Sequence, residues 1–306
     1  MKQLNLLVCI LLAITLLSCD SSINRPKVYY DFSWECTNIP CSYTHSVAVG
    51  NNGDVWASGF DSEELSYVSH IICLSTDNGN TWVQKFTFPS AGSIAINPTN
   101  GYVFVIDPHR AGLFRSTDRG ESWVKVTSTS IHIYDILITP SGEIYLGVMD
   151  ESFSYIIQNP HKGVYYSSDN GDTWIQRRNG LPDEDIRSLA LSPDGTLYAG
   201  TFNFGVYRSI DGGNTWLPPS NYTNVVISSL TVSNDGSIFA TASPFNNRLV
   251  SIPPPPPSGP PIGVLKSTDR GVTWYQVNTG LNIDEWISSV MYNPITNEIF
   301  VNNGFL

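Results

Sequence analysis

Short apolar runs separated by turn residues follow one another along most of the chain, and their length predicts β-strands rather than helices. Between residues 186 and 219 the sequence reads IRSLALSPDGTLYAGTFNFGVYRSIDGGNTWLPP. Apolar runs at 188–192, 196–201 and 205–209 predict three strands, and Trp216 opens a fourth. The PDG between the first two runs supplies the glycine that a tight hairpin needs. Four short strands joined by tight turns are typical of one β-propeller blade.

Similar sequences recur where the first hairpin of each blade is expected: NNGD at 51, PTNG at 98, PSGE at 140 and NDGS at 234. We call these the first hairpin turns. Each contains a glycine or asparagine, which tolerates the backbone conformation with φ > 0 that such a turn requires. The hairpin, like the strands, is therefore repeated along the chain.

An eight-residue segment recurs five times, and we call the five copies the repeat turns. They read STDNGNTW at 75, STDRGESW at 116, SSDNGDTW at 167, SIDGGNTW at 209 and STDRGVTW at 267. They start 41, 51, 42 and 58 residues apart, a spacing that indicates a propeller or a solenoid.

Each repeat turn is expected between the third and fourth strand of a blade. Its Asp can accept hydrogen bonds from nearby backbone N–H groups, and its Gly tolerates a left-handed backbone. Its Trp is large enough to be buried between neighbouring blades. Five copies of one catalytic centre in a chain of this size would be unusual, so we interpret the segment as structural. The structural residues are Asp77, Trp82, Asp118, Trp123, Asp169, Trp174, Asp211, Trp216, Asp269 and Trp274.

Five complete repeats end near residue 282, and the chain then has only two more strands, within 286–306. The missing half is predicted at the other end, where KVYYDFSWECT at 27–37 reads like the third and fourth strands of a blade. Residues 28–306 are therefore predicted to form an all-β, six-bladed β-propeller of four-stranded blades. Its last blade would be shared between the N-terminal segment 28–37 and the C-terminal segment, which leaves no open edge.

The first residues predict export. Lys2 precedes a largely apolar run from Leu6 to Leu17, so residues 1–18 have the pattern of a signal peptide. The end of this run, Leu-Leu-Ser-Cys19, resembles a bacterial lipobox, which implies lipidation of Cys19; an ordinary signal peptide with a chance cysteine is the alternative. Residues 19–27 would then be a tether. We expect a lipid-anchored protein of the bacterial cell envelope, on the periplasmic or outer-membrane side.

The net charge and the cysteines limit the kinds of ligand and cofactor that we expect. Without residues 1–18 the chain has 15 basic and 27 acidic residues, a net charge of −12, which argues against binding to nucleic acid. Contact with a membrane is expected only through the lipid. Cys36 and Cys41 could form a disulfide or stay as thiols, while Cys73 lies in an apolar run and is expected to be buried. No motif for a metal or a cofactor is found, so we expect neither, and we expect a monomer.

The repeat turns resemble the Asp-box (BNR) repeat, which occurs in sialidases and in many secreted propellers without enzymatic activity. The resemblance extends from about residue 28 to the end and implies a sialidase-like superfamily fold. For an active sialidase it implies three arginines for the substrate carboxylate. Arg25 lies in the tether without the usual Arg-Ile-Pro context, while Arg115 and Arg208 are expected on the face of the repeat turns. A non-enzymatic member therefore fits the sequence better.

A ligand is expected on the opposite face, where loops between the second and third strands of several blades are long. Aromatic and charged residues in these loops and in the connections between blades are the candidates: Asp61, Glu64, Tyr67, His109, Arg110, Asp150, Tyr155, Asp185, Arg187, Phe204, Arg248, Asp284, Glu285 and Trp286. We expect a binding or scaffolding module for a glycan or an envelope protein. The alternative is an exo-acting glycoside hydrolase of sialidase-like type on the same face, with catalytic residues that the sequence does not identify.

Overall fold

The computed structural model describes residues 39–40, 43–60, 70–88, 92–107, 112–127, 131–149, 162–182, 185–244, 262–283 and 287–303. All secondary structure within these ranges is β-strand, in six antiparallel sheets that follow the order of the chain. No helix among these residues is long and apolar enough to cross a membrane.

The first three sheets each have four strands. Sheet 1 contains β1 (Tyr43–Val49), β2 (Val55–Phe60), β3 (His70–Ser75) and β4 (Val83–Phe88). Sheet 2 contains β5 (Ile94–Ile96), β6 (Val103–Asp107), β7 (Gly112–Ser116) and β8 (Val124–Lys125). Sheet 3 contains β9 (His132–Ile138), β10 (Ile144–Met149), β11 (Gly163–Ser167) and β12 (Ile175–Arg177).

The last three sheets are less uniform. Sheet 4 contains β13 (Ile186–Leu191), β14 (Leu197–Thr201) and β15 (Val206–Ser209), and an isolated bridge between Arg208 and Leu217 takes the place of its fourth strand. Sheet 5 contains β16 (Val225–Val232), β17 (Ile238–Pro244), β18 (Gly263–Ser267) and β19 (Tyr275–Gln276). Sheet 6 contains β20 (Ile287–Asn293) and β21 (Glu298–Asn303).

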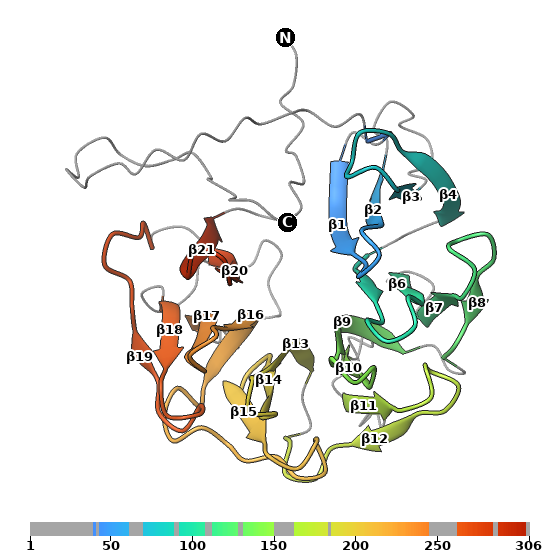
Figure 1. Ribbon diagram of the computed structural model, residues 1–306. Helices are drawn as coiled ribbons and strands as arrows, with labels where there is room; N and C mark the ends of the chain where they lie inside the picture. Colours follow the sequence, from blue (N-terminus) through green and yellow to red (C-terminus); the bar gives the residue numbers. More distant parts are fainter. Residues whose placement is uncertain are drawn as a thin grey trace, which may run out of the picture.

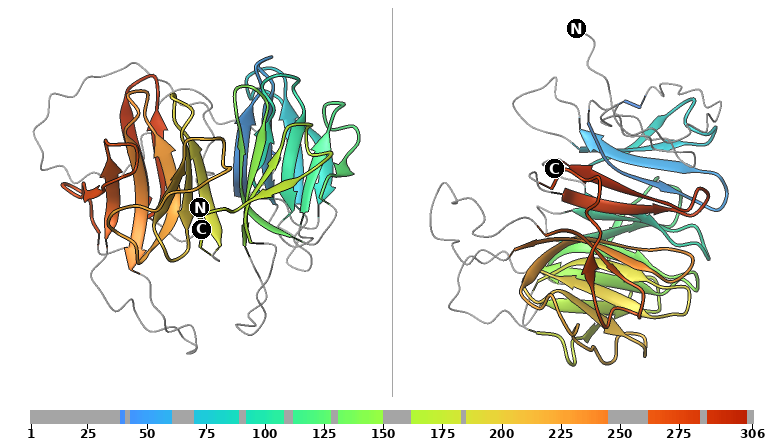
Figure 2. Two further views of the ribbon diagram at one scale, coloured as in Figure 1. Left: turned by 90° about the horizontal axis from the view of Figure 1, so that it is seen from below. Right: turned by 90° about the vertical axis from the view of Figure 1, so that its left-hand side faces the viewer.

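The sheets stand side by side around a ring, with β1, β9, β13, β16 and β20 nearest the centre and β4, β8, β12 and β19 on the outside (Figure 1). Seen edge-on, the strands run across the thickness of the ring (Figure 2). This arrangement is a β-propeller, and it confirms the predicted fold class. The segment 28–37 lies outside the described residues, so the six-bladed closure stays a prediction.

The hydrophobic core consists of separate clusters between neighbouring sheets. Between sheets 1 and 2, for example, Trp56 and Ile72 pack with Val103 and Val105, and Trp123 of the repeat turn covers them. Comparable clusters lie between sheets 2 and 3, 3 and 4, and 4 and 5. Cys73 is buried beside Ile71, as predicted. Burial of these apolar faces holds each sheet against its neighbours.

The two ends of the strands define two faces. The turn face carries the first hairpin turns and the repeat turns. The loop face is the opposite one, where the innermost strands begin and where the second strand of each sheet ends. On the loop side, five of the innermost strands contain a β-bulge, and we call the extra residue the bulge residue. The bulge residues are His45, Tyr134, Arg187, Ser228 and Ser288.

Candidate functional site

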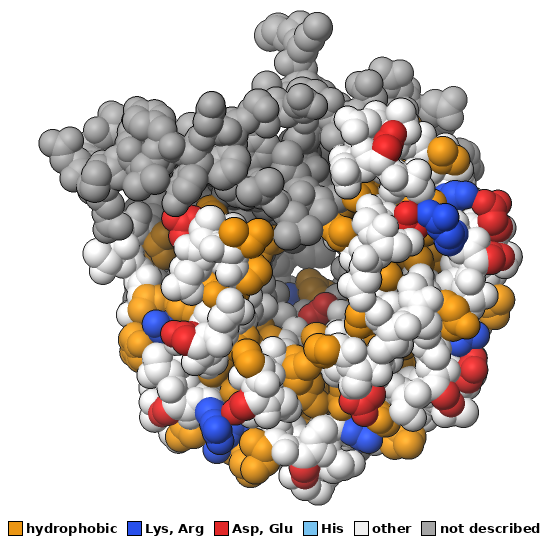
Figure 3. Space-filling view, viewed as in Figure 1, with side chains coloured by type: hydrophobic (Ala, Val, Ile, Leu, Met, Phe, Trp, Pro, Cys, Tyr) orange, Lys and Arg blue, Asp and Glu red, His pale blue; other side chains and the backbone are white. Residues whose placement is uncertain are grey.

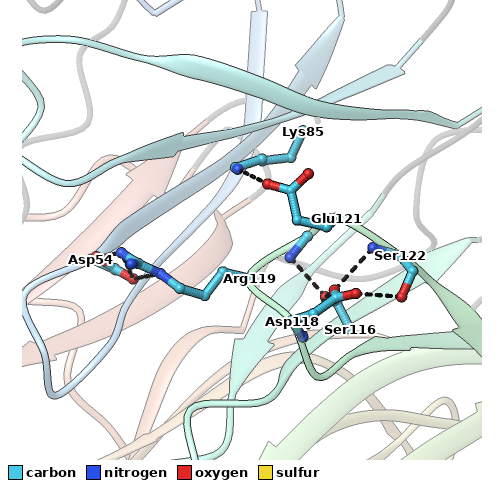
Figure 4. Close-up of polar contacts among 8 residues, drawn as sticks. Asp54, Lys85, Ser116, Asp118, Arg119, Glu121 and Ser122 are labelled. Carbon is cyan, nitrogen blue, oxygen red and sulfur yellow. Dashed lines mark hydrogen bonds and ion pairs between the residues drawn. The ribbon is translucent and has the colours of Figure 1, made fainter.

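The repeat turns on the turn face are internally hydrogen-bonded. In the second copy, Asp118 accepts bonds from the backbone N–H of Ser122 (2.9 Å) and from the hydroxyls of Ser122 (2.5 Å) and Ser116 (2.9 Å) (Figure 4). The hydroxyl of Ser122 is the largest of the causes that lower the pKa of Asp118 to about 2. Arg119 and Gly120 both have φ > 0. The other four copies repeat these bonds, which are those expected of a structural turn.

The residue between Asp and Gly of a repeat turn reaches the preceding sheet. Arg119 forms a two-pronged ion pair with Asp54 in the first hairpin turn of sheet 1, at 2.6–3.0 Å (Figure 4). Nε of Arg270 pairs with the carboxylate of Asp194 in the first hairpin turn of sheet 4, at 3.1 Å. The equivalent Asn170 accepts a bond from Asn97, at 2.8 Å. These ties fix neighbouring sheets to each other, and sequence reasoning missed them because the partners are far apart in the chain.

A pocket of about 260 Å³ opens on the turn face between sheets 1 and 2, with Leu74 and Val83 on its apolar side. Its charged groups are already committed, because Lys85 pairs with Glu121 at 2.5 Å and Arg119 pairs with Asp54 (Figure 4). A polar ligand would have to compete with these pairs. We therefore do not place the functional site there.

On the loop face, the residue that follows a bulge ties its strand to the next sheet. The hydroxyl of Ser188 accepts the backbone N–H of Leu230 at 3.0 Å, and Ser46 and Ser229 make the equivalent bonds to Ile94 and Val290. Sheet 3 has an acid instead: the Asp135 carboxylate accepts the N–H of Leu189 at 2.7 Å. Burial raises the pKa of Asp135 to about 6, although hydrogen bonds from Leu189 and Ile136 oppose the shift.

The bulge residues themselves differ from sheet to sheet. Sheets 5 and 6 have serine at this position, whereas sheets 1, 3 and 4 have His45, Tyr134 and Arg187. Bulges often redirect a side chain near a functional site. In the space-filling view, which shows the turn face, the ring is hollowed at its centre (Figure 3). On the opposite, loop face, sheets 1, 3 and 4 thus carry larger bulge residues than sheets 5 and 6.

Two aromatic rings contact Arg187. Its guanidinium carbon lies 5.1 Å from the ring centre of Tyr134 in the preceding sheet and 4.3 Å from that of Phe202. Cation–π contacts of this kind fix the position of the side chain. Two residues before Arg187, Oδ1 of Asp185 lies 3.8 Å from Nζ of Lys162. We call Tyr134, Arg187 and Phe202 the Arg187 cluster.

A second ring cluster lies on sheet 1. His45 is stacked on His70, with ring centres 5.2 Å apart and planes 12° apart, and Phe60 lies 5.4 Å from each. Burial lowers the pKa of His45. Phe60 occupies the place in sheet 1 that Phe202 occupies in sheet 4, because each follows the partner of the residue before the bulge. Two sheets thus pair a bulge residue with an aromatic ring in the same way.

A family model, described as DUF6242 beta propeller domain, matches residues 31–196. These residues include both ring clusters except Phe202. This chain belongs to the DUF6242 beta propeller domain family. No curated protein matches this DUF6242 propeller in sequence.

Several solved structures are similar in fold. The GH74 xyloglucanase from Xanthomonas campestris is 18% identical, with a TM-score of 0.58, and the match covers 82% of this chain and 42% of the enzyme. A GH74 enzyme from Niastella koreensis is 19% identical, with a TM-score of 0.60, over 85% of this chain and 45% of the enzyme. YCF48 bound to D1 peptide is 18% identical, with a TM-score of 0.55, over 82% and 72%. The DUF6242 propeller spans less than half the length of the two enzymes, and at these identities the likeness shows the fold alone.

Three of the candidate ligand residues from the sequence fall within the described part of the DUF6242 propeller. Arg187 and Asp185 lie on the loop face, and their role in binding a ligand stays a prediction. Phe204 is half-buried against the core between sheets 3 and 4, and its N–H bonds to Thr201, so its place is structural. The other eleven candidates lie outside the described residues, as do Cys19, Cys36 and Cys41: Asp61, Glu64, Tyr67, His109, Arg110, Asp150, Tyr155, Arg248, Asp284, Glu285 and Trp286.

Sequence reasoning missed the partners of Arg187. Tyr134 and Phe202 are unremarkable in the sequence, because an aromatic residue at a strand end reads as core. A bulge has no clear sequence pattern, so its extra residue could not be identified. Tyr134 and Phe202 can be distinguished from other aromatic residues at strand ends only when the same position is compared in all sheets.

Proposed function

We propose that this DUF6242 propeller is a lipid-anchored binding or scaffolding module of the bacterial envelope, with Asp-box-type turns that serve the fold. Its ligand, a glycan or another envelope protein, would bind on the loop face. Anchoring at Cys19, six blades and a monomeric state are parts of the same proposal.

The observation that carries the proposal is the unequal set of bulge residues. Ser228 and Ser288 show that the fold accepts serine at this position. His45, Tyr134 and Arg187 are therefore larger than the fold requires, and Tyr134 exposes 44% of its surface. Exposed aromatic and arginine side chains are enriched where proteins bind partners.

The turn face supports the proposal by contrast. Its charged side chains pair with one another across neighbouring sheets, as Arg119 does with Asp54 and Arg270 with Asp194. A surface whose charges are already paired gains little from a new polar ligand. YCF48, which has a similar fold, was solved with a bound peptide, so a propeller of this kind can bind a peptide.

The experiment compares the two faces. Residues 20–306 are tested for binding to a panel of soluble acidic and neutral glycans, using Arg187→Ser, His45→Ser and, as the turn-face control, Arg119→Ala. We expect the loop-face variants to weaken binding by about tenfold or more, as loss of a charged or aromatic contact does, while Arg119→Ala does not. Binding that Arg119→Ala abolishes and the loop-face variants leave intact would refute the proposal.

A second experiment tests for a protein ligand. A photo-crosslinking residue is placed in the anchored protein at Tyr134 and, as a matched control, at Val124, an exposed position on an outer strand. A crosslinked partner from Tyr134 alone supports binding on the loop face. Sugar release from any glycan, lost in a loop-face variant, would instead establish the glycosidase alternative.

A further inference from the structure

Arg187 has an unusual environment. Among the described residues its guanidinium takes part in no hydrogen bond and no ion pair, and its Nε is shielded from solvent. Shielded polar groups in proteins nearly always have a hydrogen-bond partner. An arginine without one, on the face where the ligand is proposed, needs an explanation.

The two rings restrict how a ligand can approach Arg187. The ring centres of Tyr134 and Phe202 lie 5.1 and 4.3 Å from the guanidinium carbon, so these two directions of approach are already occupied. The free donors of a guanidinium are N–H groups in its plane, and their fork matches two oxygens of a carboxylate or phosphate group. A partner for Arg187 must therefore approach from the side that the rings leave open and supply acceptors to these N–H groups.

The protein contains a template for this contact. On the turn face, Nε and Nη2 of Arg119 both bond to the Asp54 carboxylate, at 2.6–3.0 Å (Figure 4). Arg187 offers the same donors, and no carboxylate in the described part of the chain accepts from them. A ligand oxyanion would take the part at Arg187 that Asp54 takes at Arg119.

The nearest acids do not replace such a ligand. The Asp135 carboxylate accepts the N–H of Leu189, and Asp185 lies beside Lys162. Neither forms an ion pair with Arg187. Although the whole chain has a net charge of −11, a local cation with no carboxylate partner among the described residues favours an anion over a neutral group.

We propose that Arg187 binds an oxyanion, a carboxylate or phosphate group, of the ligand on the loop face. This rests on the proposed function and makes it more specific. Arg187 is half-buried rather than sealed, so a small shift of its side chain along the two rings brings the edge of the guanidinium to the ligand.

The test observes the Nε–H directly. In ¹⁵N-labelled protein, arginine Nε–H groups give their own NMR signals, and shielding of Nε slows exchange of its proton with water. The signal of Arg187 is assigned by its loss in Arg187→Lys. Acetate, glucuronate and inorganic phosphate are then added at constant ionic strength, with chloride and glucose as controls, because added salt alone screens surface charges.

We expect a saturable downfield shift of the Arg187 signal with at least one oxyanion. The signal of Arg119 is the internal control and should stay in place, because its Nε already bonds to Asp54. The response to carboxylates or to phosphate identifies the group. Tyr134→Ser, which places at this bulge the residue found in sheets 5 and 6, should weaken the response.

A signal that does not move, or that moves no more than that of Arg119, overturns the proposal. Arg187→Ser separates this outcome from failure of the proposed function. If the NMR signal does not move but Arg187→Ser no longer binds a glycan or protein ligand, the loop face binds that ligand through Arg187 without an oxyanion contact. If neither Arg187→Ser nor His45→Ser loses a ligand that the unaltered protein binds, both proposals are wrong.

Discussion

Replacing Asp135 by Asn should make the protein less sensitive to pH between weakly acidic and neutral conditions. Asp135 accepts the backbone N–H of Leu189 across the junction of sheets 3 and 4, and burial raises its pKa from 3.8 to about 6. The native carboxyl therefore holds its proton more tightly than the unfolded one. Between these two pKa values the native state binds more protons, so this group makes the free energy of unfolding fall as pH rises.

The size of the effect follows from the shift. About two pKa units correspond to about 3 kcal/mol, lost gradually from about pH 4 to about pH 6 and fully lost above it. An Asn at 135 keeps an oxygen for the N–H of Leu189 and does not titrate. Its amide N–H groups carry a cost if they stay unpaired, but that cost is the same at every pH.

The assay is urea unfolding of Asp135→Asn and of the unaltered protein, followed by Trp fluorescence at several pH values. The free energy of unfolding of the variant, relative to the unaltered protein, should rise by about 3 kcal/mol between about pH 4 and about pH 7. Asp235→Asn is the control of opposite sign, because hydrogen bonds led by that of Ser233 lower the pKa of Asp235. Parallel curves for Asp135→Asn and the unaltered protein would refute the reasoning.

Three further predictions concern the turns and the connection before β15. Asp118→Asn should remove stability that the unaltered protein has above about pH 4 and loses toward pH 2, because the pKa of Asp118 is lowered to about 2; unfolding midpoints across this range check it. Arg119→Ala should leave Asp54 buried without its partner and lower stability by about 1–3 kcal/mol in urea unfolding, whereas an unchanged midpoint would show that the pair contributes nothing. Gly205→Ala should destabilise more than Gly195→Ala in thermal unfolding, because both have φ > 0 but only at 205 would the new Cβ collide with a backbone carbonyl.

The sequence predicts the repeated part of this structure well, because each copy of the repeat needs the same residue types at the same positions. The repeat turn needs an acceptor, a residue that tolerates φ > 0 and an apolar anchor, and Asp118, Gly120 and Trp123 show all three. The strands of sheet 4 were likewise predicted to within two residues at each end. The prediction of a fourth strand in sheet 4 was wrong, because Leu217 forms only an isolated bridge with Arg208.

The contacts between sheets could not be predicted in the same way. The partner of Arg119 is Asp54, and nothing in the local sequence of either residue indicates the other. The Arg187 cluster depends on a bulge and on a ring from the preceding sheet, so it exists only once the sheets are side by side. Most candidate ligand residues were placed in long connections, where neither periodicity nor turn chemistry determines the backbone.

Differences among the repeats are therefore the most informative part of the sequence. Where all sheets need the same contact, they should share the same residue, as Ser46, Ser188 and Ser229 do in the ties between innermost strands. Sheet 3 departs from this set at Asp135, and the adjacent bulges of sheets 3 and 4 depart from serine as well. Because other sheets have serine at the equivalent positions, the fold does not require these larger and charged side chains. Because two of the three larger bulge residues, Tyr134 and Arg187, fall at the same junction as Asp135, we infer that selection for a ligand acts there. The loop face between sheets 3 and 4 is therefore the first place to look for the ligand.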